Sequence, residues 1–265
     1  MDHFKLYLKS CRMLMKSQWQ YRTSFILQTF TQLIMMGTEL LAVIFLINRF
    51  TNLGQWSGGE ILFFFGVIIT SFYLTETFGR GITHFAPLIS RGDLDTLLIR
   101  PRNLLFQILC SQADPRRLGA ILVGVAALVM GCIQADVALN FTKCLLLIWS
   151  IIGGAALVLG LFMIEATLCF FSVKSIEMIN VLTYGGRSTC QYPIDIYPRW
   201  LQLLFSVVAP FALTTHVPAA YILGKPLWNT GLLAAFIAPL SGFIFLGVMI
   251  LVFYQGLKHY RSTGS

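Results

Sequence analysis

Long apolar runs decide what this chain can fold into. About 20 hydrophobic residues in a helix cross a hydrocarbon core of about 30 Å. Because 57% of the residues are hydrophobic and only 11% are charged, too little polar surface remains for a soluble protein of 265 residues. The sequence therefore predicts a single-domain, all-α polytopic membrane protein over 1–265 with six transmembrane helices. The apolar runs lie at 24–48, 60–78, 117–134, 142–171, 200–220 and 228–254.

The distribution of Lys and Arg orients these helices. With the amino terminus in the cytoplasm, 16 of these cations fall in cytoplasmic segments and three on the outer side. Cytoplasmic segments carry the excess of positive charge, so both termini are predicted to be cytoplasmic. The net charge of +8 is then an orientation signal and no sign of nucleic-acid binding. The outer cations are Arg49, Lys143 and Lys225, and the inner ones are Lys5, Lys9, Arg12, Lys16, Arg22, Arg80, Arg91, Arg100, Arg102, Arg116, Arg117, Lys174, Arg187, Arg199, Lys258 and Arg261.

Residues 1–22 show an amphipathic pattern ahead of the first apolar run. Basic residues occupy one face of the predicted helix, and mostly apolar residues occupy the other. This pattern is typical of a helix that lies in the inner membrane interface, against membrane lipid. This helix would be either a simple anchor or a mechanical elbow leading into the first span. Its apolar face has Phe4, Tyr7, Leu8, Cys11, Leu14, Met15, Gln18 and Trp19, and its basic face has Lys5, Lys9, Arg12 and Lys16.

Charges gather in the cytoplasmic segment 87–102, which contains RGDLDTLLIRP. Ser90 and Asp93 have the spacing of a capping box, and Pro101 stops a helix, so a helix of about ten residues is expected between them. The residues allow two interpretations. The segment is either an ordinary positively charged loop, or a short charged helix with an apolar flank that is held at the inner membrane face. The candidate residues are Ser90, Arg91, Asp93, Leu94, Asp95, Leu98, Arg100, Pro101 and Arg102.

Residues 173–199 are predicted to form a second cytoplasmic loop. Pro193 and Pro198 in QYPIDIYPRW (191–200) are incompatible with a regular helix. Tyr192, Tyr197 and Trp200 suit the aromatic belt at a membrane interface, just before the span at 200–220.

Polar side chains interrupt the first apolar run on one helical face. Gln28, Gln32 and Glu39 stand at i, i+4 and i+11. An acid at this depth costs about 2.5–3.5 kcal/mol, so the face should avoid lipid. It would either line a path through the membrane or form hydrogen bonds with a helix of a partner subunit.

Catalytic and metal-binding motifs are missing from the sequence. There is no GxxxxGK[ST] phosphate loop, HExxH or GxSxG, and the histidines and cysteines lack ligand spacing. We therefore predict no catalytic residue, no metal and no cofactor in this chain.

Four segments together resemble the ABC-2-type transporter permeases, in the six-span branch of about 260 residues. They are RGDLDTLLIRP (91–101), YPIDIYP (192–198), APFALTTHVPA (209–219) and GLKHYRSTGS (256–265). The resemblance covers essentially the whole chain.

The resemblance implies an exporter subunit in the cell membrane that works with other chains. It implies a second permease, more often different than identical, and a dimer of a cytoplasmic ABC ATPase that binds ATP and Mg²⁺. Residues 87–102 match the helix that couples such permeases to the ATPase. The cargo would be a drug-like amphiphile, a lipid or glycolipid, or a peptide. Any outer re-entrant helix would have to come from about 217–227.

Two other functional classes are weighed against this one. An ion-coupled secondary transporter needs ionisable groups near mid-membrane, for which Glu39 and Glu165 are candidates, but no repeat relates the two halves. A non-transport membrane protein lacks support from paired catalytic residues. Co-purification with an ATPase would distinguish the first class from both.

Overall fold

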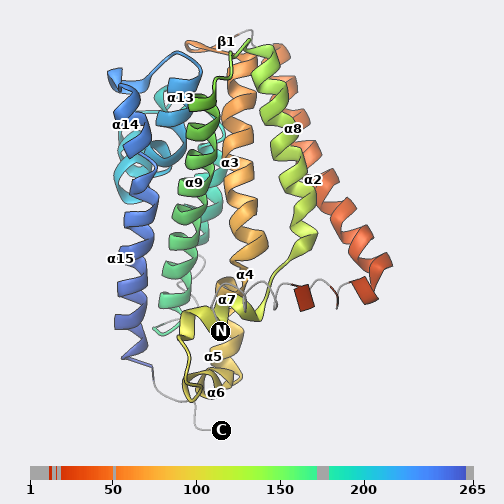
Figure 1. Ribbon diagram of the computed structural model, residues 1–265, viewed down its shortest axis with the longest axis vertical. Helices are drawn as coiled ribbons and strands as arrows, with labels where there is room; N and C mark the ends of the chain where they lie inside the picture. Colours follow the sequence, from red (N-terminus) through yellow and green to blue (C-terminus); the bar gives the residue numbers. More distant parts are fainter. Residues whose placement is uncertain (1–11, 14–15, 17–18, 50–51, 172–178, 261–265) are drawn as a thin grey trace.

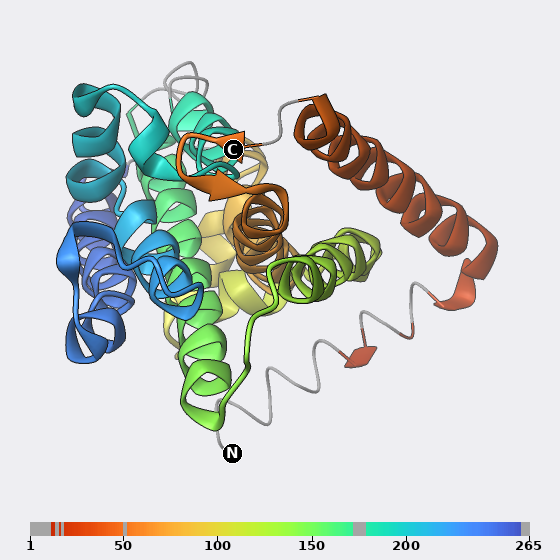
Figure 2. The same ribbon diagram turned by 90° about the horizontal axis from the view of Figure 1, so that it is seen from above.

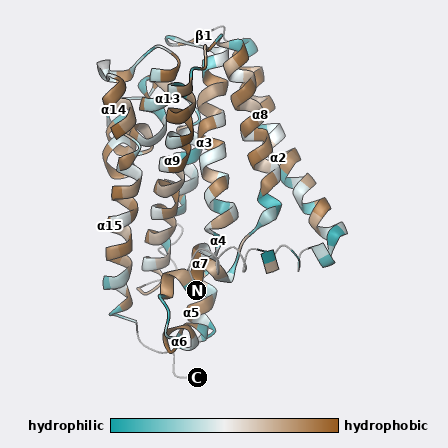
Figure 3. Cartoon of the chain, viewed as in Figure 1, coloured by the Kyte–Doolittle hydropathy of each residue, from teal (hydrophilic) through white to brown (hydrophobic). Residues whose placement is uncertain are grey.

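A computed structural model describes residues 12–13, 16, 19–49, 52–171 and 179–260. It is a bundle of long helices, apolar along most of its height (Figures 1 and 3). Among the described residues, five helical segments are long and apolar enough to cross a membrane, so the predicted all-α polytopic fold is confirmed. They are α2 (Arg22–Arg49), α3 (Gly58–Phe78), α8 (Leu118–Gln134, preceded by the 3-10 turn η1 at Pro115–Arg117), α9 (Phe141–Leu168) and the pair α14 (Leu232–Ile237) and α15 (Leu240–Leu257).

Helix α3 is the centre of the bundle, with 89% of the residues in its most apolar stretch buried. Figure 2 shows it surrounded by the other helices, while α2 stands to one side. Glycines allow this close packing: a Cβ at Gly66 would lie 2.6 Å from the Leu128 backbone nitrogen, and one at Gly131 would lie 2.6 Å from that of Phe63. Small residues at helix contacts are the usual means of packing in lipid, where apolar burial gives little driving force.

One end of the bundle has a block of short helices between α3 and α8 (Figure 1). It comprises α4 (Arg80–Thr83), α5 (Phe85–Ser90), α6 (Asp93–Leu98) and α7 (Leu104–Ser111). This end holds Arg80, Arg91, Arg100 and Arg102, and the excess of cations makes it the cytoplasmic end. Helix α2 begins and α15 ends at this same end (Figure 1).

The opposite, outer end is closed by a short hairpin of β1 (Asn52–Leu53) and β2 (Trp56–Ser57). The Trp56 indole nitrogen donates to Asp195 at 2.8 Å, and the Gln55 amide donates to the same carboxylate at 2.9 Å. Asp195 lies in the 3-10 turn η4 (Ile194–Ile196). The prediction that 173–199 forms one cytoplasmic loop is therefore wrong, because its last part lies at the outer end.

The chain crosses the bundle between these two ends. Phe171, after α9, contacts His259 near the end of α15 at the cytoplasmic end, whereas Asp195 is at the outer end. Within the described part of this crossing lie the π-helical turn η3 (Val181–Gly185) and α11 (Gly186–Thr189). The fifth crossing is thus made by this irregular segment and not by 200–220.

The apolar run at 200–220 folds back on itself. It forms two arms bent by 87°, Arg199–Val208 and Ala212–Ile222. Both arms have one end near the outer hairpin. The first arm follows η4, whose Asp195 accepts from Trp56, and Lys225, just after the second arm, donates to the Gln55 carbonyl at 2.8 Å. This run is therefore a re-entrant hairpin, and it is longer than the segment 217–227 expected for one. Its elements are α12 (Arg199–Leu203), η5 (Leu204–Val208), η6 (Ala212–His216) and α13 (Val217–Ile222), followed by the turn η7 (Leu227–Asn229).

The predicted amphipathic helix at 1–22 falls largely outside the described residues. Residues 12–13, 16 and 19–20 are helical, and the Trp19 ring lies 6.4 Å from that of Phe25 at the start of α2. Met13 and Trp19 are exposed, as expected for side chains that face lipid.

We predict that Arg199→Cys reacts with a membrane-impermeant maleimide in intact cells, because Arg199 is exposed at the outer end. Ile99→Cys, at the cytoplasmic end, should react only after permeabilisation. Gel shift of the labelled permease measures both. Protection of Arg199→Cys until the membrane is permeabilised would restore the cytoplasmic loop.

We also predict that Gly131→Val lowers the melting temperature of the detergent-solubilised protein by about 2–12 °C. An overpacked contact costs about 1–3 kcal/mol, and each kcal/mol corresponds to about 2–4 °C. Gly247→Val is the matched control, because nothing lies within 4 Å of a Cβ there. Equal effects of the two substitutions would contradict the close α3–α8 contact.

Candidate functional site

The charged segment at 87–102 forms two short helices instead of one. Gly92 separates α5 from α6 with a φ of +73°, a left-handed conformation that glycine adopts without steric cost. The Ser90 hydroxyl donates back to the Pro87 carbonyl at 3.2 Å and does not cap α6. The predicted ten-residue helix with a capping box is therefore wrong in its boundaries, because the chain turns at Gly92.

Aromatic side chains attach α5 to the ends of the spans. The fully buried Phe85 ring lies 5.2 Å from Phe170 and 5.4 Å from Phe253, centroid to centroid. Phe170 follows α9, and Phe253 belongs to α15. Edge-on aromatic pairs of this kind add about 0.5–1.5 kcal/mol each beyond apolar burial. These contacts fix α5 to the cytoplasmic ends of both spans.

Buried and polar contacts fix α6 and the turn that follows it. Leu94 is fully buried under the block, and the Gln107 amide donates to the carbonyls of Leu97 and Arg102 at 3.1 and 3.0 Å. The Tyr254 hydroxyl of α15 donates to Asn103 at 3.1 Å. Of the predicted residues, those with exposed side chains are Ser90, Arg91, Asp93, Leu98, Arg100, Pro101 and Arg102, while Asp95 is partly buried.

The tip of this block exposes apolar side chains among charged ones. Ile99 is 83% exposed and Leu98 is 43% exposed. Ile99 was not singled out from the sequence, because its exposure depends on the turn that follows α6. We call residues 90–102 the cytoplasmic tip. It exposes apolar and charged side chains together, and protein-binding surfaces commonly combine both kinds.

A second polar site lies at mid-depth in the bundle. The Arg187 guanidinium of α11 pairs with Glu39 of α2 at 3.1 Å and donates to the Tyr73 hydroxyl of α3 at 3.1 Å. It also lies over the Phe72 ring at 5.5 Å, and the Gln191 amide donates to Glu39 at 2.9 Å. The sequence assigned Arg187 to a loop, so this ion pair was not foreseen.

The three polar residues of the first span do not share one environment. Gln28 and Gln32 line a polar pocket at the cytoplasmic end, whereas Glu39 pairs with Arg187 farther along α2. Among the described residues, the Glu39 carboxylate therefore has a partner within its own chain. Whether this face lines a path or contacts a second permease stays a prediction.

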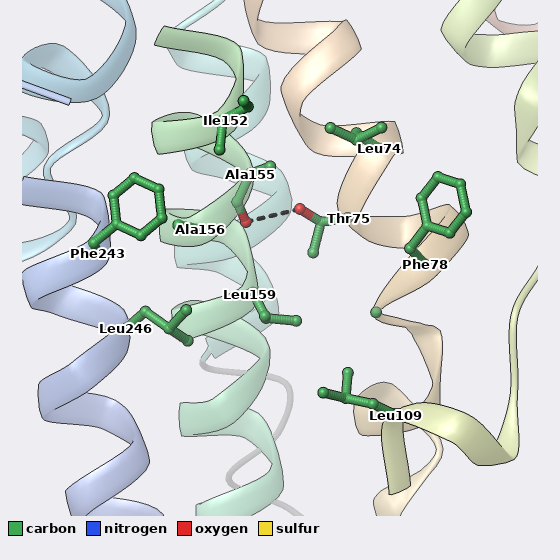
Figure 4. A pocket seen from close by; sticks show the side chains of 11 residues that line it. Leu74, Thr75, Phe78, Leu109, Ile152, Ala155, Ala156, Leu159, Phe243 and Leu246 are labelled. Atoms are coloured by element: carbon green, nitrogen blue, oxygen red, sulfur yellow. Dashed lines mark hydrogen bonds between the residues drawn. The ribbon is translucent and has the colours of Figure 1, made fainter. Parts of the chain in front are cut away.

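An apolar groove of about 450 Å³ opens between α3, α9 and α15 (Figure 4). Ala155 and Ala156 of α9 stand between larger side chains of the neighbouring helices, including Phe78 and Phe243. The Thr75 hydroxyl donates to the Ala155 carbonyl at 2.8 Å, so the polar groups near the floor are paired. The groove is lined mainly by apolar side chains and therefore suits an apolar chain.

Comparison with known proteins identifies the class. The model of the family described as "ABC-2 family transporter protein" matches residues 33–264. The chain belongs to this family. No curated protein and no solved structure matches it significantly.

Membership of the ABC-2 family makes this chain a membrane permease of an ABC transporter, a multi-pass protein of the cell membrane. The family is a transport component and generally works with an ABC ATPase. Among the described residues of this permease, no three His, Cys, Asp or Glu side chains come together as metal ligands.

We predict that Glu39→Leu and Arg187→Met each destabilise the permease by about 1–3 kcal/mol, because each leaves a partly buried charge without its ionic partner. The double variant should be more stable than either single variant, since no unpaired charge remains. Thermal unfolding of the four proteins in detergent measures this coupling. Additive losses would show that the pair is not coupled.

Proposed function

We propose that the chain is the permease subunit of an ATP-driven exporter, with the cytoplasmic tip as the binding site for the ABC ATPase dimer. The observation that carries this proposal is the exposed Ile99 at the end of the bundle, outside the spans and among charged residues. Covering an apolar side chain of this size contributes about 1.5–3 kcal/mol. In this view ATP and Mg²⁺ bind only to the partner.

The attachment of the tip supports a mechanical role. Phe85 connects α5 to α9 and α15, and Leu94 and Gln107 connect α6 to α7 and its neighbours. A movement of the ATPase against Ile99 would therefore tilt the spans as a rigid body. Rigid-body movement about an interface is one of the ways in which proteins transmit a conformational change. The charged side chains of Arg91, Asp93 and Arg100 would set the orientation in which the ATPase binds.

The exposed surface of α2 supports a second permease beside this one. Only Met36 and Val43 of its 28 residues are buried. A membrane helix with so little contact in its own chain has room for another subunit as well as for membrane lipid. We propose a heterodimer of two ABC-2 permeases in preference to a homodimer, with outward transport of a drug-like amphiphile, a lipid or glycolipid, or a peptide.

An ion-coupled secondary transporter is the alternative function. Its first candidate, Glu39, is neutralised by Arg187 within the chain. Glu165, its second candidate, is partly buried in α9. No described feature favours this alternative over the exporter.

The ATPase site can be tested by photo-cross-linking in native membranes. A benzoylphenylalanine replaces Ile99, and adducts are identified by mass spectrometry. We expect an adduct with a chain that contains the GxxxxGK[ST] loop of ABC ATPases.

A benzoylphenylalanine in place of Trp228 is the matched control, because Trp228 is 53% exposed at the outer end. It should give no adduct with an ATPase. The proposal would be overturned if the Ile99 position gave no ATPase adduct, or if both positions gave it equally.

A further inference from the structure

A polar pocket of about 260 Å³ lies where α2, α4 and the start of α8 meet at the cytoplasmic end. Three arginines, Arg80, Arg116 and Arg117, line it together with Asp114 and the polar face of α2 at Gln28 and Gln32. Figure 3 shows hydrophilic residues at the lower ends of α2 and α8, below long apolar stretches. The pocket is separate from the cytoplasmic tip, and neither the transport class nor the ATPase site accounts for it.

A buried carboxylate holds the three guanidinium groups in place. Asp114, 5% exposed, pairs with Nε of Arg116 at 2.6 Å, of Arg80 at 3.4 Å and of Arg117 at 3.7 Å. Arg117 also pairs with Glu76 at 3.0 Å, and Arg116 donates to the Gln28 side-chain oxygen. Two carboxylates thus face three arginines, which leaves one positive charge in excess.

Donors remain after these contacts are made. A guanidinium has five N–H groups, and among the described residues Arg80 makes its ion pair through Nε alone. The surrounding field is positive. Burial lowers the pKa of the neighbouring His84, and the charges of Arg80 and Arg116 lower it further, against the opposite effect of Asp114. An anion that enters the pocket would meet oriented donors and a favourable field.

The position of the pocket suggests the source of that anion. α2 begins at Arg22 and α8 at Leu118, so the pocket lies about two to three turns inside α2 and directly before the start of α8. Leu118 and Leu122, next along α8, are 38% and 62% exposed. An amphiphile with its phosphate among the arginines would therefore find apolar surface for its chains on the membrane side. A free soluble anion would make no use of that surface.

We propose that this pocket binds the phosphate group of an anionic phospholipid of the inner leaflet. Arginine forks match phosphate oxygens two at a time, and Gln28 and Gln32 add neutral hydrogen-bonding groups at the wall. The bound headgroup would connect α2 to α4 and η1, three elements that meet around the pocket. This inference concerns the permease alone and does not depend on its ATPase partner or cargo.

Native mass spectrometry of the purified permease in detergent tests the proposal. The protein is incubated with equal amounts of phosphatidylglycerol and phosphatidylcholine of the same chain length, and the retained lipid is counted. We expect the wild type to retain phosphatidylglycerol in preference. Arg80→Gln combined with Arg116→Gln should reduce this preference about tenfold, the effect of losing a charge-assisted hydrogen bond of about 1.5 kcal/mol. Arg117 still pairs with Asp114 in that variant.

Arg199→Gln is the matched control, because it removes an exposed guanidinium at the outer end and should leave the preference unchanged. Gln32→Leu and Arg116→Lys keep the test valid if the double variant does not fold. The first changes no recorded ion pair and the second keeps the charge, and both should reduce the preference by at least twofold.

Inorganic phosphate at a concentration matched to the lipid distinguishes the two sources of the anion. It should not displace phosphatidylglycerol from the wild type. Displacement by phosphate would show a site for soluble anions and would overturn the lipid assignment. Equal retention of both lipids by the wild type, or an unchanged preference in Gln32→Leu and Arg116→Lys, would overturn the site itself.

Discussion

The close approach of α8 and α9 to α3 is the constraint on which the other contacts depend. At Gly66 and Gly131 the backbones of α3 and α8 touch with no room for a side chain, and a Cβ at Gly154 of α9 would lie 2.9 Å from the Ser71 hydroxyl oxygen of α3. Because lipid tails are as apolar as the helix surfaces, such contacts give more stability than burial itself. A fixed α3 then positions the outer hairpin at its start and the cytoplasmic block at its end.

The sequence predicted the regular part of the fold because apolar length is a local property. Five of the spans follow from it. So does the placement of the start of α2 and the end of α15 at the same end of the bundle. The fifth crossing could not be found in this way, since it contains Arg187 and Gln191 and is not one regular helix. Their charge and polarity are satisfied by Glu39, which is about 150 positions away. The run at 200–220 has the right length, but the chain bends by 87° within it, so it returns to the outer end.

The sequence predicted where the candidate site lies along the chain, but not how that segment folds. The charges at 87–102 located the cytoplasmic tip, because an apolar chain must concentrate its polar surface where it leaves the membrane. Gly92 looked like an ordinary helix position, although its left-handed backbone divides the segment. Ile99 was not among the candidate residues, because its exposure depends on the turn after α6. The arginine pocket was invisible for another reason: Gln28, Arg80 and Arg116 come together only through the packing of three helices.

Among the spans that the structure describes, α2 is the least buried, with 11% of the residues in its most apolar stretch inside the bundle. It is held by Glu39–Arg187 at mid-depth, and near its foot by Gln28–Arg116 and by one close glycine contact, where a Cβ at Gly119 of α8 would lie 2.6 Å from the Thr29 carbonyl oxygen. A polar contact can be exchanged for water or for another donor without steric cost, but a glycine contact has no second arrangement. The middle of α2 is therefore held mainly by contacts that can be exchanged, whereas its foot is fixed against α8. A change of shape that preserves the glycine contacts can move the middle of this helix but not its foot.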